Sequence, residues 1–302
     1  MSTRYVPALR LSPGELGDRV EQLAGFMAGR RLVVLTGAGC STESGIPDYR
    51  GPETRRRARS PIEFAAFARD PQARKRYWAR ATVGWWRFAD KAPNAAHHAL
   101  AELERRGVVS GVITQNVDDL HERAGSATVV PLHGSLSRVR CLDCGAEADR
   151  RALQARLAEL NPELAGRVAH RTEQAPDGDA ELPQQLVDGF RVVDCERCGG
   201  PLKPAVVFFG ENVPPARVQR AFALCDAADG LLVVGSSLEV YSGLRFVRRV
   251  AVERDKPVAI LNVGPTRGDA LAALRIEGVA GEVLPATVAA LEGYCAPPGR
   301  PA

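Results

Sequence analysis

The stretch T-G-A-G-C-S-T-E-S-G-I-P-D-Y-R, residues 36–50, decides the fold of this chain. It follows the apolar run 32–35, which is typical of a buried strand. A strand that leads directly into Gly37 and Gly39 favours a diphosphate site, because backbone N–H groups without a Cβ beside them can approach an anion closely. The sequence therefore predicts a dinucleotide-binding loop at the end of this strand.

The spacing of the loop differs from the dehydrogenase fingerprint. A G-x-G-x-x-G match that starts at Gly37 requires a third glycine at position 42, where Thr42 stands. Gly45 and Pro47 then occupy positions where a crossover helix would continue. We expect a mobile segment that covers the dinucleotide and carries an apolar residue, an acid, an aromatic and a base, namely Ile46, Asp48, Tyr49 and Arg50.

Strand and helix patterns alternate along the rest of the chain. Ser12 and Glu15 form a capping-box pattern at the start of a helix that should end near Gly29. Further strands are predicted at 108–114, 128–132, 206–209, 231–234 and 257–262. Further helices are predicted at 60–88, 95–107, 151–160, 216–227, 242–254 and 284–294, and residues 175–188 are predicted to be loop. This alternation predicts an α/β fold with a parallel sheet and helices on both faces.

Residues suited to ligand binding follow the predicted strands. In parallel sheets, ligand-binding loops lie at the carboxyl ends of the strands. Those positions hold Gly37, Gln115, His133, Gly235 and Asn262. We therefore expect them to meet along one edge of the sheet.

Composition limits the classes of function. The 302 residues are enough for one large and one smaller domain, and a net charge of +4 gives no basic stripe that would indicate nucleic acid. No apolar run approaches the ~18 residues of a membrane span. The amino terminus lacks an apolar signal region, which favours a cytoplasmic protein, and the oligomeric state stays open.

Two C-x-x-C pairs stand out among the seven cysteines. Cys141 and Cys144 form one pair, and Cys195 and Cys198 form the other. Two such pairs favour a structural zinc site with four thiolates and no position for water, whereas a redox dithiol needs only one pair. The odd number of cysteines also fits a reducing compartment.

Polar side chains follow the strand at 108–114. Gln115, Asn116 and Asp118 can orient a ribose and a carboxamide, although Asn116 or Asp118 can equally cap a short helix. His133 ends the next strand, beside Gly134, and can take a proton from a hydroxyl. A lone histidine is more often structural, but the position of His133 favours a general base.

Taken together, these motifs resemble those of the sirtuins, the NAD-dependent protein lysine deacylases. The resemblance covers roughly residues 32–291 and extends to the class II branch, which includes a mitochondrial sirtuin and bacterial relatives. It rests on the loop at 36–50, T-Q-N-V-D-D-L-H, L-H-G, the paired C-x-x-C, V-V-F-F-G-E, V-V-G-S-S-L-E-V and I-L-N-V-G-P-T.

The resemblance implies a Rossmann-type NAD-binding domain made of residues 12–50, 95–138 and 204–295. It also implies a smaller domain, in which a helical insertion at 51–94 joins a zinc-binding module at 139–203. NAD and an acyl-lysine protein or peptide would enter the cleft between the two domains from opposite sides.

The resemblance also assigns roles to residues, with His133 as the general base. The cofactor-binding loop would comprise Gly37, Ala38, Gly39, Ser41, Thr42, Glu43, Ile46, Pro47, Asp48, Tyr49 and Arg50. The nicotinamide riboside would contact Gln115, Asn116 and Asp118, and the adenosine end would contact Gly235, Ser236, Ser237, Asn262, Val263, Gly264 and Ala280. The peptide and acyl group would contact Val207, Phe208, Phe209, Gly210 and Glu211.

In the implied reaction, the acyl-lysine oxygen attacks C1′ of the nicotinamide ribose as nicotinamide leaves. His133 then deprotonates a ribose hydroxyl, and the products are free lysine and O-acyl-ADP-ribose. The first alternative is mono-ADP-ribosylation of protein at the same NAD site. The second alternative is a non-catalytic NAD sensor, and His133 together with the amide and acid side chains argues against it. The third is a nicotinamide-dependent oxidoreductase, and the missing third glycine argues against that.

A tyrosine and an arginine at i and i+3 bear on the acyl group. Tyr77 and Arg80 share one helix face, and sirtuins that remove acidic acyl groups use such a pair to bind a carboxylate. Surface salt bridging or packing against Trp85 is the equal alternative. Three residues depart from the family pattern: Cys40, Asp119 and Ala280.

Overall fold

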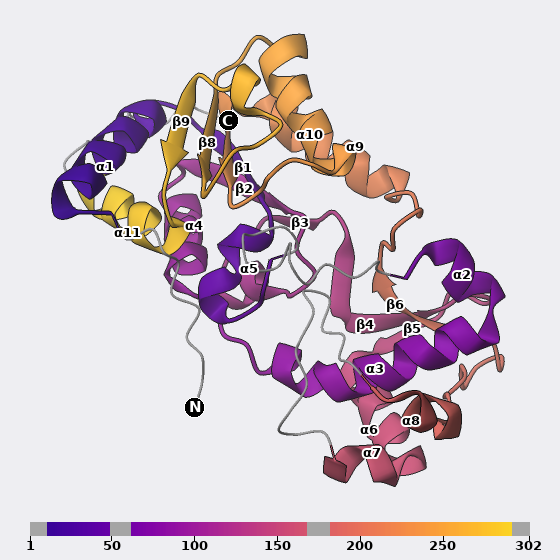
Figure 1. Cartoon of the computed structure of the whole chain (residues 1–302). Coiled ribbons are helices and arrows are strands. Elements are labelled where there is room, and N and C mark those ends of the chain that lie inside the picture. Colours follow the sequence, from indigo (N-terminus) through magenta and orange to yellow (C-terminus); the bar gives the residue numbers. More distant parts are fainter. Residues whose placement is uncertain (1–10, 49–61, 168–181, 292–302) are drawn as a thin grey trace.

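The computed structural model describes residues 11–48, 62–167 and 182–291 (Figure 1). Six parallel strands form the main sheet in the order β3-β2-β1-β7-β8-β9. These strands are β1 (Leu32–Thr36), β2 (Val109–Thr114), β3 (Val129–Pro131), β7 (Gly230–Val234), β8 (Val258–Asn262) and β9 (Leu274–Glu277). The predicted parallel sheet is confirmed, and β9 is a strand that the sequence analysis missed.

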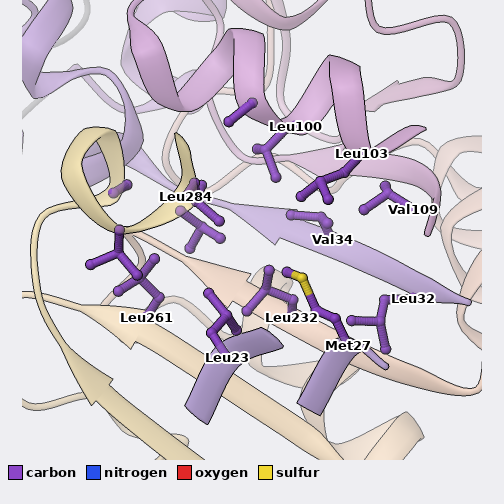
Figure 2. Close-up of a cluster of buried hydrophobic side chains, with 14 of the residues drawn as sticks. Leu23, Met27, Leu32, Val34, Leu100, Leu103, Val109, Leu232, Leu261 and Leu284 are labelled. Atoms are coloured by element: carbon purple, nitrogen blue, oxygen red, sulfur yellow. The ribbon is translucent and has the colours of Figure 1, made fainter. Parts of the chain in front are cut away.

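Helices cover both faces of this sheet, as predicted. One face packs against α1 (Pro13–Met27), α4 (Ala95–Arg105) and α11 (Ala280–Ala290), and the other against α9 (Pro215–Ala227) and α10 (Tyr241–Arg248). Figure 2 shows the first interface, where Val34 of β1 lies beside Leu103 of α4, and Leu232 of β7 lies beside Leu23 and Met27 of α1. Alternate residues of β1 point to opposite layers, which explains why all four residues from Leu32 to Leu35 are apolar.

A second sheet lies beyond the carboxyl edge of the first (Figure 1). It is antiparallel, with β4 (Gly134–Cys141) between β5 (Glu147–Asp149) and β6 (Leu202–Val206). The helices beside it are α2 (Phe64–Arg69), α3 (Pro71–Ala89), α6 (Arg150–Leu160), α7 (Pro162–Arg167) and α8 (Gln184–Gly189). A separate apolar cluster joins these elements. The exact domain boundaries given in the sequence analysis stay a prediction.

Three local predictions were wrong. The strand expected at 206–209 is β6 at Leu202–Val206, and it pairs with β4 instead of joining the parallel sheet, because Gly134 turns the chain at φ +85° into that partner. The helix expected at 60–88 breaks at Pro71, where the Asp70 carboxylate caps α3 by accepting from Gln72 N. The segment expected to be loop at 175–188 contains the start of α8, and its first residues lie outside the described part.

Most other elements lie close to their predicted positions. The Ser12–Glu15 capping box is present at the start of α1, with Ser12 N donating to Glu15 Oε2 at 2.9 Å. The helix expected at 242–254 is α10 followed by a π-helical turn at Arg249–Glu253. Shorter elements are α5 (Leu120–Arg123) and 3-10 turns at Ala38–Cys40, Thr42–Ser44 and Asp269–Leu271. Of the helices in the described ranges, none is long and apolar enough to cross a membrane.

Candidate active site

The loops after β1 and β7 meet at the point where the strand order reverses. These two strands are neighbours, and the chain leaves them towards opposite edges of the sheet, which is the point at which open α/β sheets bind their ligands. Gly39 N donates to Gly235 O at 2.8 Å. A Cβ on Gly37 would lie 2.8 Å from Gly235 O, and Gly235 itself has φ +61°. Glycine is therefore required on both sides of this contact.

Neutral amides and hydroxyls line the same edge. Ser236 Oγ donates to Gln115 Oε1 at 2.7 Å, which joins the ends of β7 and β2. Asn116 Nδ2 donates to Gly37 O at 3.1 Å and to Ser41 Oγ at 2.9 Å. The structure thus brings together Gln115, Asn116 and the cofactor-loop residues that the sequence analysis selected.

Asp118 is the acid of this group. Its Oδ2 accepts from Ser41 Oγ at 2.7 Å, and its Oδ1 accepts from Leu120 N at 3.0 Å. Asp118 thus bonds both the first N–H of α5 and the cofactor loop, but the N-cap position of α5 is Asp119, whose side chain makes no capping hydrogen bond in the described part of the chain. Burial raises the pKa of Asp118, and the hydrogen bond from Ser41 opposes that rise.

Hydrogen bonds fix the imidazole of His133. Its Nδ1 lies 2.8 Å from Gln115 O, and because a carbonyl only accepts, Nδ1 carries the proton. Its Nε2 therefore presents a lone pair and accepts from Ser242 Oγ at 2.9 Å. Burial, followed by the positive charges of Arg245 and Arg217, lowers the pKa of His133, while the hydrogen bond to Gln115 opposes this. The ring is thus held neutral, the form that acts as a base.

The remainder of the cofactor loop contacts two other elements. Thr42 Oγ1 donates to Gly39 O at 3.0 Å, and Glu43 Oε2 accepts from Gly281 N at 2.8 Å beside the buried Ala280 of α11. Ile46 is buried in an apolar cluster with Trp85 and Phe88. The other predicted residues here are Ala38, Pro47 and Asp48, all partly buried, and Tyr49 and Arg50, which lie outside the described residues.

The predicted adenosine contacts lie at the ends of β7 and β8. Asn262 is buried, and its Nδ2 donates to Gly264 O at 3.0 Å. Val263 is exposed, and Gly264 has φ +79°. Ser237 O accepts from Arg267 N at 3.0 Å. These residues thus form the turn on the β8 side of the same edge.

The four cysteines of the two C-x-x-C pairs converge. The four Sγ atoms all lie within 4.8 Å of one another, and Cys141 Sγ is 3.5 Å from Cys198 Sγ. Cys144 Sγ and Cys195 Sγ are 3.8 Å apart. Zinc–sulfur bonds of about 2.3 Å in a tetrahedron place sulfurs about 3.8 Å apart. The cluster therefore fits a four-thiolate zinc ion, and the chemistry of the donors leaves no open position.

The segment after β6 runs beside His133. Val207 N donates to His133 O at 2.8 Å, and Phe209 is exposed and bridges to Glu63. Gly210 adopts φ +77° in the turn that follows. Glu211 points inward, because its Oε2 accepts from Phe208 N and from the buried Lys203 Nζ, both at 2.9 Å. Glu211 therefore holds this segment in place instead of facing solvent.

Tyr77 and Arg80 differ in how far they are buried. Tyr77 is buried, with its ring packed edge-on against Phe67 and Phe208, whereas Arg80 is partly exposed. Arg150 is buried near this pair and lies 4.7 Å above the ring of Trp85. Burial lowers the pKa of Arg150 to about 10.

Two further positions that support the site were missed. Ser242 is 109 residues from His133 in sequence, so no local pattern links the two. Asn94 Nδ2 donates to Cys40 O at 2.8 Å in the cofactor loop, and Asn94 Oδ1 is 2.9 Å from His97 Nδ1. The spacing of Asn94 and His97 is a capping pattern for α4, which is the signal that could have pointed to them.

The sequence of this chain is similar to those of known proteins. The sequence model of the Sir2 family matches residues 37–242. NAD-dependent protein deacetylase 1 of Mycobacterium avium is 52% identical, covering 87% of this chain and 92% of that protein. The NAD-dependent protein lipoamidase sirtuin-4, mitochondrial, of Bos taurus is 49% identical, covering 89% and 85%.

Solved structures agree with the sequences. A Sir2 homologue in complex with NAD superposes with a TM-score of 0.68 at 35% identity, covering 90% of this chain and 94% of that chain. A Sir2 complex with p53 peptide and NAD⁺ gives a TM-score of 0.65 at 29% identity, covering 94% and 98%. This chain belongs to the Sir2 family.

Proposed function

We propose that this chain is an NAD-dependent protein lysine deacylase that transfers the acyl group of acyl-lysine to ADP-ribose and releases nicotinamide. The observation that carries the proposal is the lone pair of His133 Nε2 at the carboxyl edge of the sheet, next to Gln115 and the glycine loops. The deacetylase and lipoamidase activities named for the relatives support the same reaction.

NAD is the co-substrate, and the donor set at the edge suits it. Close packing of the two glycine loops fixes their backbone, whose N–H groups can bind a diphosphate, while hydroxyls and amides can bond riboses and a carboxamide. We assign the diphosphate to Gly37, Ala38, Gly39, Ser41 and Thr42, with Gly235 and Ser236 opposite. We assign the nicotinamide riboside to Gln115, Asn116 and Asp118, and the adenosine to Ser237, Asn262, Val263, Gly264, Glu43 and Ala280.

His133 acts as the base in this proposal. NAD supplies the ADP-ribose that takes the acyl group as nicotinamide leaves. The Nδ1–H bond to Gln115 O keeps the ring in one tautomer, so that Nε2 takes a proton from a ribose hydroxyl. Ile46, Pro47, Asp48, Tyr49 and Arg50 are assigned to a cover that excludes water from the reacting carbon.

The acyl-lysine substrate is assigned to the segment after β6. Val207 to Glu211 runs directly beside His133, which supports an extended peptide lying along this segment, with the exposed Phe209 side chain available for contact. Zinc is assigned a structural role, because four thiolates complete its shell and Cys141 ends the strand that pairs with β6.

The acyl preference is the finer part of the proposal. Tyr77 contacts Phe208 in the substrate segment, and Arg80 lies one turn further along α3, which supports a preference for acidic or long acyl groups over acetyl. Acetyl-, glutaryl- and lipoyl-lysine peptides compared in the wild type and in Arg80→Ala test this. An unchanged ratio of rates in Arg80→Ala, with acetyl fastest, contradicts it.

Product analysis tests the main proposal. Mass spectrometry after incubation with NAD and an acyl-peptide panel should find O-acyl-ADP-ribose and free lysine. ADP-ribosylated protein without O-acyl-ADP-ribose would support the transferase alternative, which no separate observation favours. Intact NAD with every peptide would overturn both.

The cellular setting is part of the proposal. Four thiols gathered at one point need a reducing compartment to stay available for zinc, which supports the cytoplasm. We propose acyl-lysine proteins as partners, with no role for nucleic acid or membrane.

A further inference from the structure

A second cluster of metal-binding side chains lies under the cofactor loop. Cys40, His97 and His121 each offer one donor atom, and these atoms lie within 4.8 Å of one another. All three residues are buried, with 0%, 0% and 1% of their surface exposed. They come from the turn after β1, from α4 and from α5, so the fold and not local sequence brings them together.

Each imidazole has one nitrogen occupied and one nitrogen available. His97 Nδ1 is 2.9 Å from Asn94 Oδ1 and 3.3 Å from Asn94 N, and the shorter contact, to an oxygen that only accepts, places the proton on Nδ1. His121 Nε2 is 2.9 Å from Thr36 Oγ1. On the other side, His121 Nδ1 is buried and has no hydrogen-bond partner among the described residues. His97 Nε2 has only a distant contact, 3.5 Å from Ser41 Oγ. Metal-binding histidines usually have this pattern, in which an oxygen holds the second nitrogen and orients the ring.

We propose that Cys40 Sγ, His97 Nε2 and His121 Nδ1 bind a transition metal ion, with Zn²⁺ as the best fit, at a site distinct from the four-cysteine cluster. One thiolate and two imidazoles suit Zn²⁺ and do not suit Mg²⁺ or Ca²⁺, which prefer oxygen. Zinc bonds of about 2.0–2.3 Å in a tetrahedron place donor atoms less than about 4 Å apart, so any donor pair near the 4.8 Å limit has to move closer when the metal binds. When the Cys40–metal bond forms, the thiol proton leaves to solvent.

The charges around the cluster fit a divalent cation. The hydrogen bonds to Asn94 Oδ1 and Thr36 Oγ1 leave each imidazole one nitrogen for the metal. Zn²⁺ with one thiolate leaves one net positive charge. Asp118 compensates it through Ser41, the residue after Cys40, because Ser41 Oγ donates to the Asp118 carboxylate at 2.7 Å.

Occupation of this site would act on the cofactor loop. Cys40 N donates to Gly37 O at 2.9 Å, and Cys40 O accepts from Asn94 Nδ2 at 2.8 Å. Drawing Cys40 Sγ towards two imidazoles therefore displaces Gly39 and Ser41, to which the proposed function assigns the diphosphate. We expect Zn²⁺ to inhibit NAD turnover, and because the donors are buried, we expect binding to be slow.

Metal content tests the site independently of activity. Protein that already holds one zinc ion per chain is incubated with excess Zn²⁺, desalted and measured by elemental mass spectrometry. We expect close to two zinc ions in the wild type and in Cys225→Ala, which removes another buried cysteine outside both clusters, but one in Cys40→Ala. Equal zinc content in the wild type and Cys40→Ala overturns the proposal.

Cobalt and thermal unfolding give two further readouts. Co²⁺ added to the zinc-loaded wild type should give a sulfur-to-cobalt charge-transfer band that is absent in Cys40→Ala and weakened in His121→Gln. Added Zn²⁺ should raise the unfolding temperature of the wild type and not that of Cys40→Ala. If the variants bind metal as the wild type does, the site is wrong. If metal binds but NAD turnover does not change, the site stands and the inhibitory role, which rests on the proposed function, is wrong.

Discussion

Ser242 donates a hydrogen bond from Oγ to Nε2 of His133 at 2.9 Å, and this contact joins the first turn of α10 to the end of β3. Because His133 Nδ1–H is held by Gln115 O, Nε2 is the nitrogen with the lone pair. The serine hydroxyl therefore occupies the position from which we propose that a ribose hydroxyl gives up its proton. It also favours the neutral form of the ring.

Ser242→Ala should change the pH profile of the reaction. A base works only when unprotonated, so kcat/KM falls as pH drops below the pKa of His133. Burial lowers this pKa, which places the acid limb of the wild type below about 6.5. Removing the donor to the neutral ring raises the pKa and moves the acid limb to higher pH. Ser242→Thr, which keeps the hydroxyl, is the control, and an acid limb that stays in place in Ser242→Ala contradicts the assignment.

His133→Ala should separate the two halves of the reaction. Loss of a general base lowers the rate of O-acyl-ADP-ribose formation by roughly 10²–10⁴. Exchange of labelled nicotinamide into NAD in the presence of acyl-peptide should persist, because in the proposed order the base acts after nicotinamide leaves. The exposed His98→Ala is the matched control. Equal loss of both activities, with the fold intact by thermal unfolding, would show that His133 has another role.

Gly235→Ala should weaken NAD binding and stability together. A Cβ at Gly235 would lie 2.3 Å from Cys40 N and 2.6 Å from Gly39 C, so the cofactor loop has to move. Gly107→Ala is the control, because it lies outside the proposed NAD site and has a similar positive φ of +76° but nothing within 4 Å of its added Cβ. We expect strain alone in the control, about 1–2 kcal/mol, and at least a tenfold rise in KM for NAD only in Gly235→Ala. Steady-state kinetics and urea unfolding measure both effects.

The site residues at the edge of the sheet were predictable because each one directly follows an apolar strand pattern in the sequence. Each apolar run ends at a residue of the site, and in a parallel sheet the carboxyl ends meet whatever the order of the strands. Gly37, Gln115, Gly235 and Asn262 were found in this way, and the structure places all four at this edge.

Contacts between distant segments were not predictable in the same way. Nothing near Ser242 or Lys203 shows that the first reaches His133 or that the second pairs with Glu211. The strand at 206–209 was misplaced for the same reason, since the choice of β4 as its partner depends on the turn at Gly134. An apolar sequence pattern shows that a segment is buried, whereas its pairing with a strand distant in sequence decides which sheet it joins.

The ion pair of Lys203 and Glu211 should respond asymmetrically to mutation. Lys203 is buried, whereas Glu211 is about a quarter exposed. Glu211→Ala leaves an ammonium buried without its partner, which costs roughly 3 kcal/mol, while Lys203→Met leaves a carboxylate that water can reach and costs less. Urea unfolding measures the difference. Both variants should raise KM for the acyl-peptide more than KM for NAD, because Glu211 also holds Phe208 N, and the reverse order of stabilities would contradict the proposed arrangement.

Loss of zinc should disable the substrate segment without unfolding the main sheet. Cys141 ends β4, β4 pairs with β6, and β6 leads into Val207 beside His133, so the effect passes through backbone pairing. In Cys195→Ser we expect the loss of one zinc ion per chain, loss of deacylation and a second, earlier unfolding transition. Cys225→Ala, which changes a buried cysteine between α9 and the sheet, is the control for thiol loss. Full deacylation in zinc-free Cys195→Ser would show that the thiolate cluster does not position the substrate segment.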